Sequence, residues 1–333
     1  MPVNVHSPPA SMHSATATPT LAVSVVVRSY RRLDACCELI DIIFGQDYTP
    51  FEVVVVEQTP DPTPAQAAAL AAREARYGDA LRVLRTPALG PAGARNAGWQ
   101  AARYPIVLFM DDDDLPLGAS WIARHAARFA EPGVVGVSGR EVLAPGERCG
   151  YRRRVARRYC LHYNWLGHPH TYCRFDEAVD PVHWLHGGNA SIRREAIERA
   201  GGWDAAFFDH EEHSFAFRLQ KVLRPGERLI FDPTPLMLRR KDVLGGLGRR
   251  QATVRETFDR YFDYFARVVA PHRPWRVRLL APVYGVWITG VSVRWIWKDS
   301  QRHRGFIHRL LASLGTILVA PAWLVFGLVR TPR

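Results

Sequence analysis

The sequence predicts an α/β fold built on a mostly parallel, doubly wound sheet. Three observations support this: Val-rich apolar runs of strand length recur in the first 115 residues, helical stretches separate them, and polar side chains follow them directly. Continuous apolar strands that alternate with helices are typical of a parallel sheet covered on both faces. A folded chain also fits the composition, since 47% of the 333 residues are hydrophobic and 23% are charged.

The first two expected strands are followed by clear helical stretches. The run LAVSVVV (21–27) ends at RSYRR, and a helical pattern continues to Phe44. The run FEVVVV (51–56) ends at Glu57, and a Pro-rich segment then leads into an Ala-rich helix over 65–77. This order is that of a strand-helix-strand unit with parallel strands.

Two further strands complete the first half of the expected sheet. A short LRVL (81–84) precedes GPAGARNAG, where Pro91 suits a first helical turn, and PIVLFM (105–110) runs directly into four aspartates. Ligands of open α/β sheets bind beyond the carboxyl ends of the strands. We therefore expect one crevice to contain the polar residues that follow these strands: Ser29, Arg31, Arg32, Glu57 and Asp111, Asp112, Asp113 and Asp114.

The chain divides into three parts by composition. Residues 1–20 contain Ser, Thr, Pro and Ala but no Lys, Arg or apolar run, so we expect a disordered leader. Residues 21–248 form the folded body, with a regular half (21–115) and a less regular half (116–248). Residues 249–333 are expected to be a helical, apolar and basic extension.

The positive charge of the chain is concentrated in this extension. The net charge is +12; residues 249–333 hold 15 basic and 4 acidic residues, and the first 248 hold 29 and 28. Two uncharged stretches occur there, 279–293 and the 20-residue 310–329. A 20-residue helix rises about 30 Å, enough to cross a hydrocarbon core.

We therefore expect the extension to bind an anionic membrane surface. In this arrangement 279–293 lies in the interface, 310–329 inserts or also lies there, and the basic link 294–309 stays cytoplasmic. The alternative is a helical cap packed on the body. A nucleic-acid partner is disfavoured, because the charge is interleaved with apolar helices suited to lipid.

The five cysteines do not form a recognisable framework. They are odd in number and have no CxxC spacing, which disfavours disulfides and fits a reducing compartment. Histidines 162, 168, 170, 183 and 186 lie near Cys149, Cys160 and Cys173, so a zinc site has to be considered. The gaps do not match usual finger or ribbon spacings, which disfavours it.

Two acidic groups are candidates for chemistry. Four aspartates at the end of a buried strand repel one another, which favours a hard divalent cation such as Mg²⁺ or Mn²⁺ over a solvated acidic turn. Glu211 and Glu212 open an expected helix. Either both interact with the helix dipole, or one of them is a general base that accepts a proton from a hydroxyl.

Seven sequence blocks follow one another over roughly residues 22–240: VSVVVRSYRR, VVVVEQ, GPAGARNAG, VLFMDDDD, GGNASIRREAIERAGGWD, HEEHSFAFRL and FDP. Taken in this order, they resemble the family 2 glycosyltransferases, which have the GT-A fold. The resemblance implies a catalytic domain over 21–248, in which 21–115 binds the nucleotide and 116–248 binds the acceptor.

The resemblance also implies roles for individual residues. On the donor side, it implies nucleotide binding by Ser29, Arg31, Glu57, Arg95, Asp111 and Asp112, and metal binding by Asp111 and Asp113, with Asp114 orienting the site. Arg31 replaces a frequent Asn, and Glu57 replaces the more usual Asp.

On the acceptor side, Glu212 matches the catalytic base. The residues implied to contact acceptor or donor sugar are Gly187, Gly188, Asn189, Trp203, Asp204 and Glu211. Ser214 replaces an acid of the family pattern, and Arg239 and Arg240 stand where a metal-contacting His is common, so we expect them to neutralise a diphosphate.

The implied activity is inverting transfer of one sugar from a nucleotide diphosphate-sugar, most commonly a UDP-sugar, to a hydroxyl of a lipid-linked or cell-surface saccharide. A divalent cation would be the cofactor, and the cytoplasmic face of the plasma membrane, or the cytoplasm, the location. A QxxRW-like segment of processive synthases is absent from the sequence. The alternatives are a catalytically impaired relative and a sugar nucleotidyltransferase, although the latter's Gly-rich loop after the first strand is missing.

Overall fold

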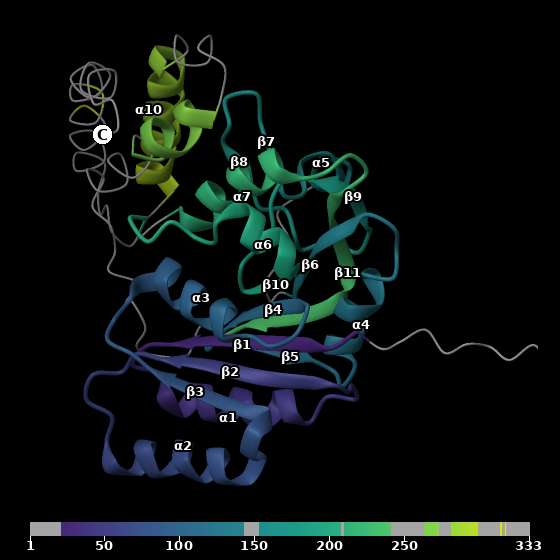
Figure 1. Ribbon diagram of the computed structural model, residues 1–333. Helices are drawn as coiled ribbons and strands as arrows, with labels where there is room; N and C mark the ends of the chain where they lie inside the picture. Colours follow the sequence, from purple (N-terminus) through teal and green to yellow (C-terminus); the bar gives the residue numbers. More distant parts are fainter. Residues whose placement is uncertain are drawn as a thin grey trace, which may run out of the picture.

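The computed structural model describes residues 21–142, 153–207, 210–240, 263–272 and 281–298, together with 314 and 317. The expected leader over 1–20 and most of the apolar stretch 310–329 lie outside the described residues. The fold is that of an α/β protein with one large central sheet (Figure 1).

The large sheet has nine strands in the order β3-β2-β1-β4-β10-β6-β11-β5, and β9 pairs with β11. Their bounds are β1 Val23–Ser29, β2 Phe51–Glu57, β3 Leu81–Arg85, β4 Ile106–Asp111, β5 Asp114–Leu117, β6 Val134–Val142, β9 Val179–Val182, β10 Asn189–Arg193 and β11 Arg228–Arg239. A separate two-stranded sheet pairs β7 (His162–Tyr163) with β8 (Pro169–His170).

Most strands of the large sheet run in one direction. Strands β1, β2, β3 and β4 are mutually parallel. Strand β10 is antiparallel to both β4 and β6, so β6 runs with β4, and β11 is parallel to β6. Six of the nine strands therefore share a direction, which confirms the expected mostly parallel sheet.

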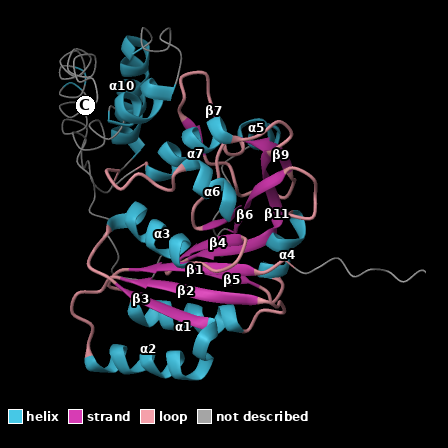
Figure 2. Cartoon of the chain, viewed as in Figure 1, coloured by secondary structure: helices cyan, strands magenta, loops and turns pink. Residues whose placement is uncertain are grey.

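Helices cover both faces of this sheet. Their bounds are α1 Leu33–Phe44, α2 Pro64–Tyr77, α3 Gly90–Ala101, α4 Trp121–Arg128, α5 Arg153–Tyr159, α6 Arg194–Ala200, α7 Glu211–Val222 and α10 Ala281–Lys298. Short turns η1 (Gly78–Ala80), η2 (Tyr264–Val269, a π-helix) and η3 (Ala270–His272) complete the described elements. Figure 2 shows α1 and α2 on one side of β1–β3, and α3 on the other.

The alternation of side chains along the strands builds two cores. Val25, Val53 and Leu108 pack on the face that carries α1 and α4. Their sequence neighbours Val26 and Val54 face the opposite way and join the residues of α6 and α7 in the second core. Because a strand presents successive side chains to opposite faces, a Val-rich run serves both cores at once.

The described part of the C-terminal extension begins by packing on the body. Tyr264, Phe265, Val268 and Val269 are buried, and the Tyr264 hydroxyl donates to the Gly167 carbonyl at 2.7 Å. The segment 263–272 is therefore a cap of the second core, the alternative to membrane contact considered for this region. No helix within the described residues has both the length and the apolar character that a membrane crossing requires.

Candidate active site

The carboxyl ends of three neighbouring strands bring the predicted polar residues together. The register of β1 against β4 places Arg28 opposite Asp111, and that of β1 against β2 places Ser29 opposite Glu57. The four aspartates follow β4 at the same edge of the sheet. This register brings the side chains together beyond the strand ends, in the grouping that the sequence predicts.

Arginines of the chain itself neutralise the four aspartates. Arg32 Nη1 lies 3.1 Å from Asp112 Oδ1 and 2.9 Å from Asp113 Oδ2. Arg28 pairs with Asp111, and Arg239 Nε lies 3.1 Å from Asp114 Oδ1. Repulsion among the aspartates therefore does not by itself require a metal, since the fold already supplies three counter-ions.

Three of the aspartates can still hold a cation together. One carboxylate oxygen from each of Asp111, Asp113 and Asp114 lies within 4.8 Å of the others. Asp112 is outside this group: it is buried, pairs with Arg32, and accepts from the Tyr30 backbone N–H at 3.4 Å. A set of hard carboxylate oxygens fits Mg²⁺ or Mn²⁺.

The acidities of these carboxyls differ strongly. Burial raises the pKa of Asp114 to about 8, and that of Asp112 to about 6, although each faces an arginine. Burial acts on Asp111 in the same direction, but Arg28, Arg95 and Arg239 together outweigh it and hold the Asp111 pKa well below its usual range. A divalent cation next to Asp114 would favour its ionised form.

A pocket of about 420 Å³ opens beside this edge of the sheet. Its lining comes from the ends of β2 and β3 and from α1 and α2: Leu33, Glu57, Thr59, Pro60, Pro62, Ala67, Leu70, Arg85, Thr86 and Pro87. The Glu57 carboxylate accepts from the Thr59 backbone N–H at 2.6 Å, and Thr59 Oγ1 accepts from the Arg31 N–H at 2.9 Å. The pocket has the size of small-molecule sites.

The second acidic pair lies on α7 and is held by a buried arginine. Arg95 Nη1 is 2.5 Å from Glu211 Oε1, and Arg95 Nη2 is 2.8 Å from Glu212 Oε1. Only 1% of the Arg95 side chain is exposed, against 25% for Glu212. Arg95, expected near the nucleotide, thus places its guanidinium on the carboxylate pair.

The pKa values of the two carboxyls of this pair are shifted in opposite directions. Burial raises the pKa of Glu211. Burial acts on Glu212 in the same direction, but the interactions with Arg95, His186 and His213 together outweigh it and lower the Glu212 pKa. Glu212 is therefore the ionised and more accessible of the two, as a proton acceptor must be.

Gly187 and Gly188 lie between the two acidic groups. A Cβ on Gly187 would come within 2.2 Å of Glu212 Oε1, and one on Gly188 within 2.4 Å of Asp114 Oδ2. Cα atoms of neighbouring residues are about 3.8 Å apart. The Gly187–Gly188 loop therefore lies close to both Glu212 and the aspartate group.

Three other residues expected on the acceptor side have structural contacts. Asn189 is fully buried, and its Oδ1 accepts from Trp121 Nε1 at 2.9 Å. Trp203 is buried and stacks on Phe215, with ring centroids 4.1 Å apart. The Asp204 carboxylate accepts from the Ala206 N–H at 2.9 Å.

Arg239 and Arg240 diverge. Arg239 faces the aspartates, whereas Arg240 Nη1 pairs with Glu38 Oε2 on α1 at 2.5 Å. The Arg240 backbone N–H donates to the Asp113 carbonyl at 2.8 Å, but of the two side chains expected at a diphosphate only that of Arg239 pairs with an aspartate among the described residues. Arg28 was missed by the sequence reasoning, although a charged residue within an otherwise Val-rich strand is a signal that could have found it.

The model of the family "Glycosyl transferase family 2" matches residues 24–201, just over half of the 333 residues. The chain belongs to glycosyl transferase family 2. It is therefore a glycosyltransferase, and the GT-A fold implied by its motifs is confirmed by solved structures. No curated protein matches the sequence.

Three solved glycosyltransferase structures share the fold at low identity. A Pyrobaculum calidifontis mannosyltransferase, PcManGT, in complex with GDP-Man and Mn²⁺, superposes with a TM-score of 0.51 at 20% identity, covering 93% of this chain and 86% of that one. GalNAc-T7 with UDP, GalNAc and Mn²⁺ superposes with a TM-score of 0.53 at 16% identity, covering 77% of this chain and 52% of that one. Staphylococcus aureus TarS 1–349 superposes with a TM-score of 0.53 at 16% identity, covering 90% of this chain and 81% of that one.

Proposed function

We propose that this family 2 glycosyltransferase moves one sugar from a nucleoside diphosphate-sugar to an acceptor hydroxyl, with inversion at the anomeric carbon. The observation that carries this proposal is that the Gly187–Gly188 loop lies close both to Glu212, whose pKa is lowered, and to Asp114 of the aspartate group. A base and a phosphate-binding group held this near to each other suit a single in-line displacement.

The donor is proposed to bind across the strand ends. The pocket that contains Glu57 and Thr59 takes the nucleoside, and the aspartate edge takes the diphosphate. Asp111, Asp113 and Asp114 would hold Mg²⁺ or Mn²⁺, which neutralises phosphate oxygens when bound. Solved relatives of the fold contain GDP-Man or UDP with Mn²⁺; the family resemblance favours a UDP-sugar here.

Glu212 and Arg239 have complementary tasks in the reaction. Glu212 accepts the proton of the acceptor hydroxyl while that oxygen forms its bond to C1 of the sugar. The bond from C1 to the phosphate oxygen breaks, and its electron pair leaves with the diphosphate. Arg239, 3.1 Å from Asp114, supplies a positive charge where this negative charge grows.

The test is release of nucleoside diphosphate by the full chain from a panel of UDP- and GDP-sugars with Mn²⁺ or Mg²⁺. We expect Glu212→Gln and Asp113→Ala to lower turnover by at least about 100-fold. Glu198→Gln is the matched control, because Glu198 only pairs with Arg194 on the outside of α6. Equal turnover in all variants, or a product that retains the anomeric configuration, would contradict the proposal.

We also propose that the enzyme works at the cytoplasmic face of the plasma membrane on a lipid-linked or cell-surface saccharide. Val283 and Val286 of α10 are 45% and 70% exposed, and the surrounding region is basic. We expect Val286→Glu to weaken co-sedimentation with anionic vesicles. Val155→Glu, on α5 of the body, is the control; equal loss in both variants, or none in either, would argue against α10 contacting lipid.

A further inference from the structure

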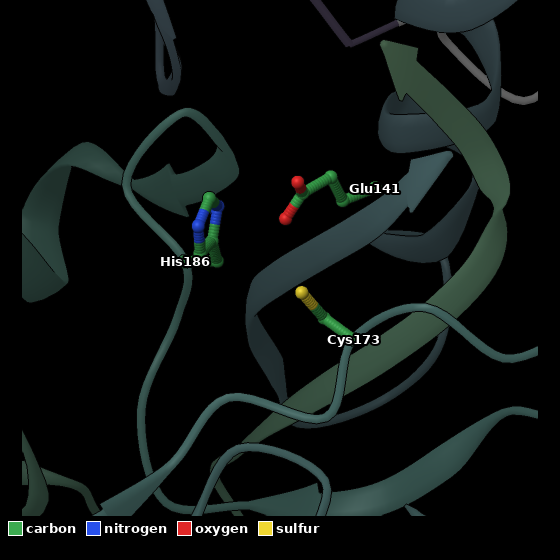
Figure 3. Close-up of side chains that lie close together, drawn as sticks. All are labelled: Glu141, Cys173 and His186. Carbon is green, nitrogen blue, oxygen red and sulfur yellow. The ribbon is translucent and has the colours of Figure 1, made fainter. Parts of the chain in front are cut away.

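Three potential metal ligands form a second group, separate in composition from the aspartates. Figure 3 shows the side chains of Glu141, Cys173 and His186 pointing toward one common space. One ligand atom from each lies within 4.8 Å of the others, and all three residues are buried. Glu141 belongs to β6, Cys173 to the loop after β8, and His186 directly precedes Gly187.

An unsatisfied polar atom marks this space as a ligand site. His186 Nδ1 is buried and has no hydrogen-bond partner among the described residues, and only 9% of the residue is exposed. A buried polar atom that nothing binds is destabilising. Cys173 is a free, buried cysteine. A cation would bind both groups at once.

The backbone and one arginine hold the three residues in place. The Glu141 N–H donates to the Cys173 carbonyl at 3.1 Å, and the His186 N–H donates to Ser138 Oγ at 3.2 Å. Arg174 Nη2 lies 2.6 Å from Glu141 Oε1, and a carboxylate has a second oxygen to offer. The ligands are thus preorganised by contacts that do not use all of their donor atoms.

We propose that Glu141, Cys173 and His186 form a zinc site. A thiolate, an imidazole and a carboxylate are the ligand types that zinc combines, whereas Mg²⁺ and Mn²⁺ prefer the all-oxygen set at the aspartates. Glu141 and the Cys173 thiolate are the two anionic ligands of the ion, and Arg174 also pairs with Glu141. Binding releases the thiol proton, and water fills the fourth position.

The proposed zinc would act on the active site through the backbone. His186 is bonded to Gly187, whose Cα approaches Glu212 and Arg95 so closely that a Cβ there would clash with both. Fixing the His186 ring fixes the start of this loop. The ligands come from three separate segments, which explains why finger and ribbon spacings are absent from the sequence.

The test uses the metal-stripped full chain titrated with Co²⁺, whose bond to a thiolate gives a near-ultraviolet charge-transfer band. We expect this band in the wild type at one equivalent, and its disappearance on addition of Zn²⁺. Cys173→Ser should remove the band. Cys160→Ser should keep it, because Cys160 is an equally buried free cysteine outside the group.

Two further variants separate this site from the catalytic one and from a folding defect. Asp113→Ala should retain the band. The test of the zinc site therefore does not depend on whether the proposed catalytic role of the aspartates is correct. His186→Gln, checked by circular dichroism, should weaken Zn²⁺ binding by at least about 100-fold. Absence of the band in the wild type, its persistence in Cys173→Ser, or unchanged affinity in His186→Gln would overturn the proposal.

Discussion

The Arg28 guanidinium holds the Asp111 carboxylate at two points, with Nε 2.6 Å from Oδ1 and Nη2 2.8 Å from Oδ2. The pairing of β1 with β4 creates this contact, because it sets the two residues opposite each other. Both side chains are only partly exposed. The enzyme therefore carries its own positive charge at the place where a cation and a diphosphate are proposed to bind.

Arg28→Met should strengthen Mn²⁺ binding in the absence of nucleotide. Arg28 and the cation compete for the same carboxylate, so removing the arginine frees Asp111. We expect an affinity gain of about tenfold, which corresponds to about 1.4 kcal/mol. Titration calorimetry with Mn²⁺ measures it. Arg85→Met, which breaks an exposed pair with Glu74, should leave the affinity unchanged; equal or weaker binding in Arg28→Met would contradict the competition.

Arg95→Met should move the acidic limb of the pH–activity profile to higher pH. Arg95 lowers the Glu212 pKa, so without it Glu212 stays protonated to a higher pH and is lost as a base over that range. The profile of kcat/KM for donor and acceptor reports this shift. Arg103→Met, at a different ion pair, is the control. A uniform loss of activity with an unmoved limb would mean that Arg95 only positions the helix.

Gly188→Ala should abolish transfer while leaving the fold intact. The new methyl group would lie 2.4 Å from Asp114 Oδ2, so the loop or the carboxylate must move, and a 1 Å misplacement can cost about 100-fold in rate. Gly290→Ala, where no atom of the described residues lies within 4 Å of the added carbon, should keep full activity. Turnover is measured as nucleoside diphosphate release. Normal turnover in Gly188→Ala would show that the Gly187–Gly188 loop does not contribute to the active site.

Local sequence patterns predicted the strands, whereas the side-chain contacts at the site depend on pairing between elements that are distant in the sequence. The Val-rich runs predicted β1, β2 and β4 because each segment carries its own strand signal. The Arg28–Asp111 pair depends on register between strands that are 83 positions apart, which no local pattern encodes. The zinc ligands are equally dispersed, and the buried role of Asn189 follows from contacts with α4 that its motif does not contain.

The pH dependence of stability should contain a contribution from His125 on α4. His125 Nε2 and Trp121 Nε1 both lie 2.9 Å from Asn189 Oδ1, and His125 Nδ1 lies 2.9 Å from Ser191 Oγ. Since the Asn189 oxygen only accepts, Nε2 must donate to it. Burial lowers the His125 pKa to about 4, so at neutral pH the ring is neutral and Nδ1 accepts from the Ser191 hydroxyl.

The sign of the effect follows from the proton count. Between pH 6.5 and about 4 the unfolded chain binds a proton on His125 and the folded chain does not, so stability falls as the pH falls through this window. The contribution is at most about 3 kcal/mol. His125→Gln lacks it, so its stability deficit relative to wild type should narrow from pH 7 to pH 4.

Urea unfolding of both proteins across this range measures the difference in the free energy of unfolding. Trp121→Phe is the matched control: it removes a hydrogen bond to the same Asn189 oxygen without removing a titratable group, so its deficit should stay constant with pH. A deficit of His125→Gln that is equally constant would show that His125 takes up its proton in the folded enzyme as readily as in the unfolded chain.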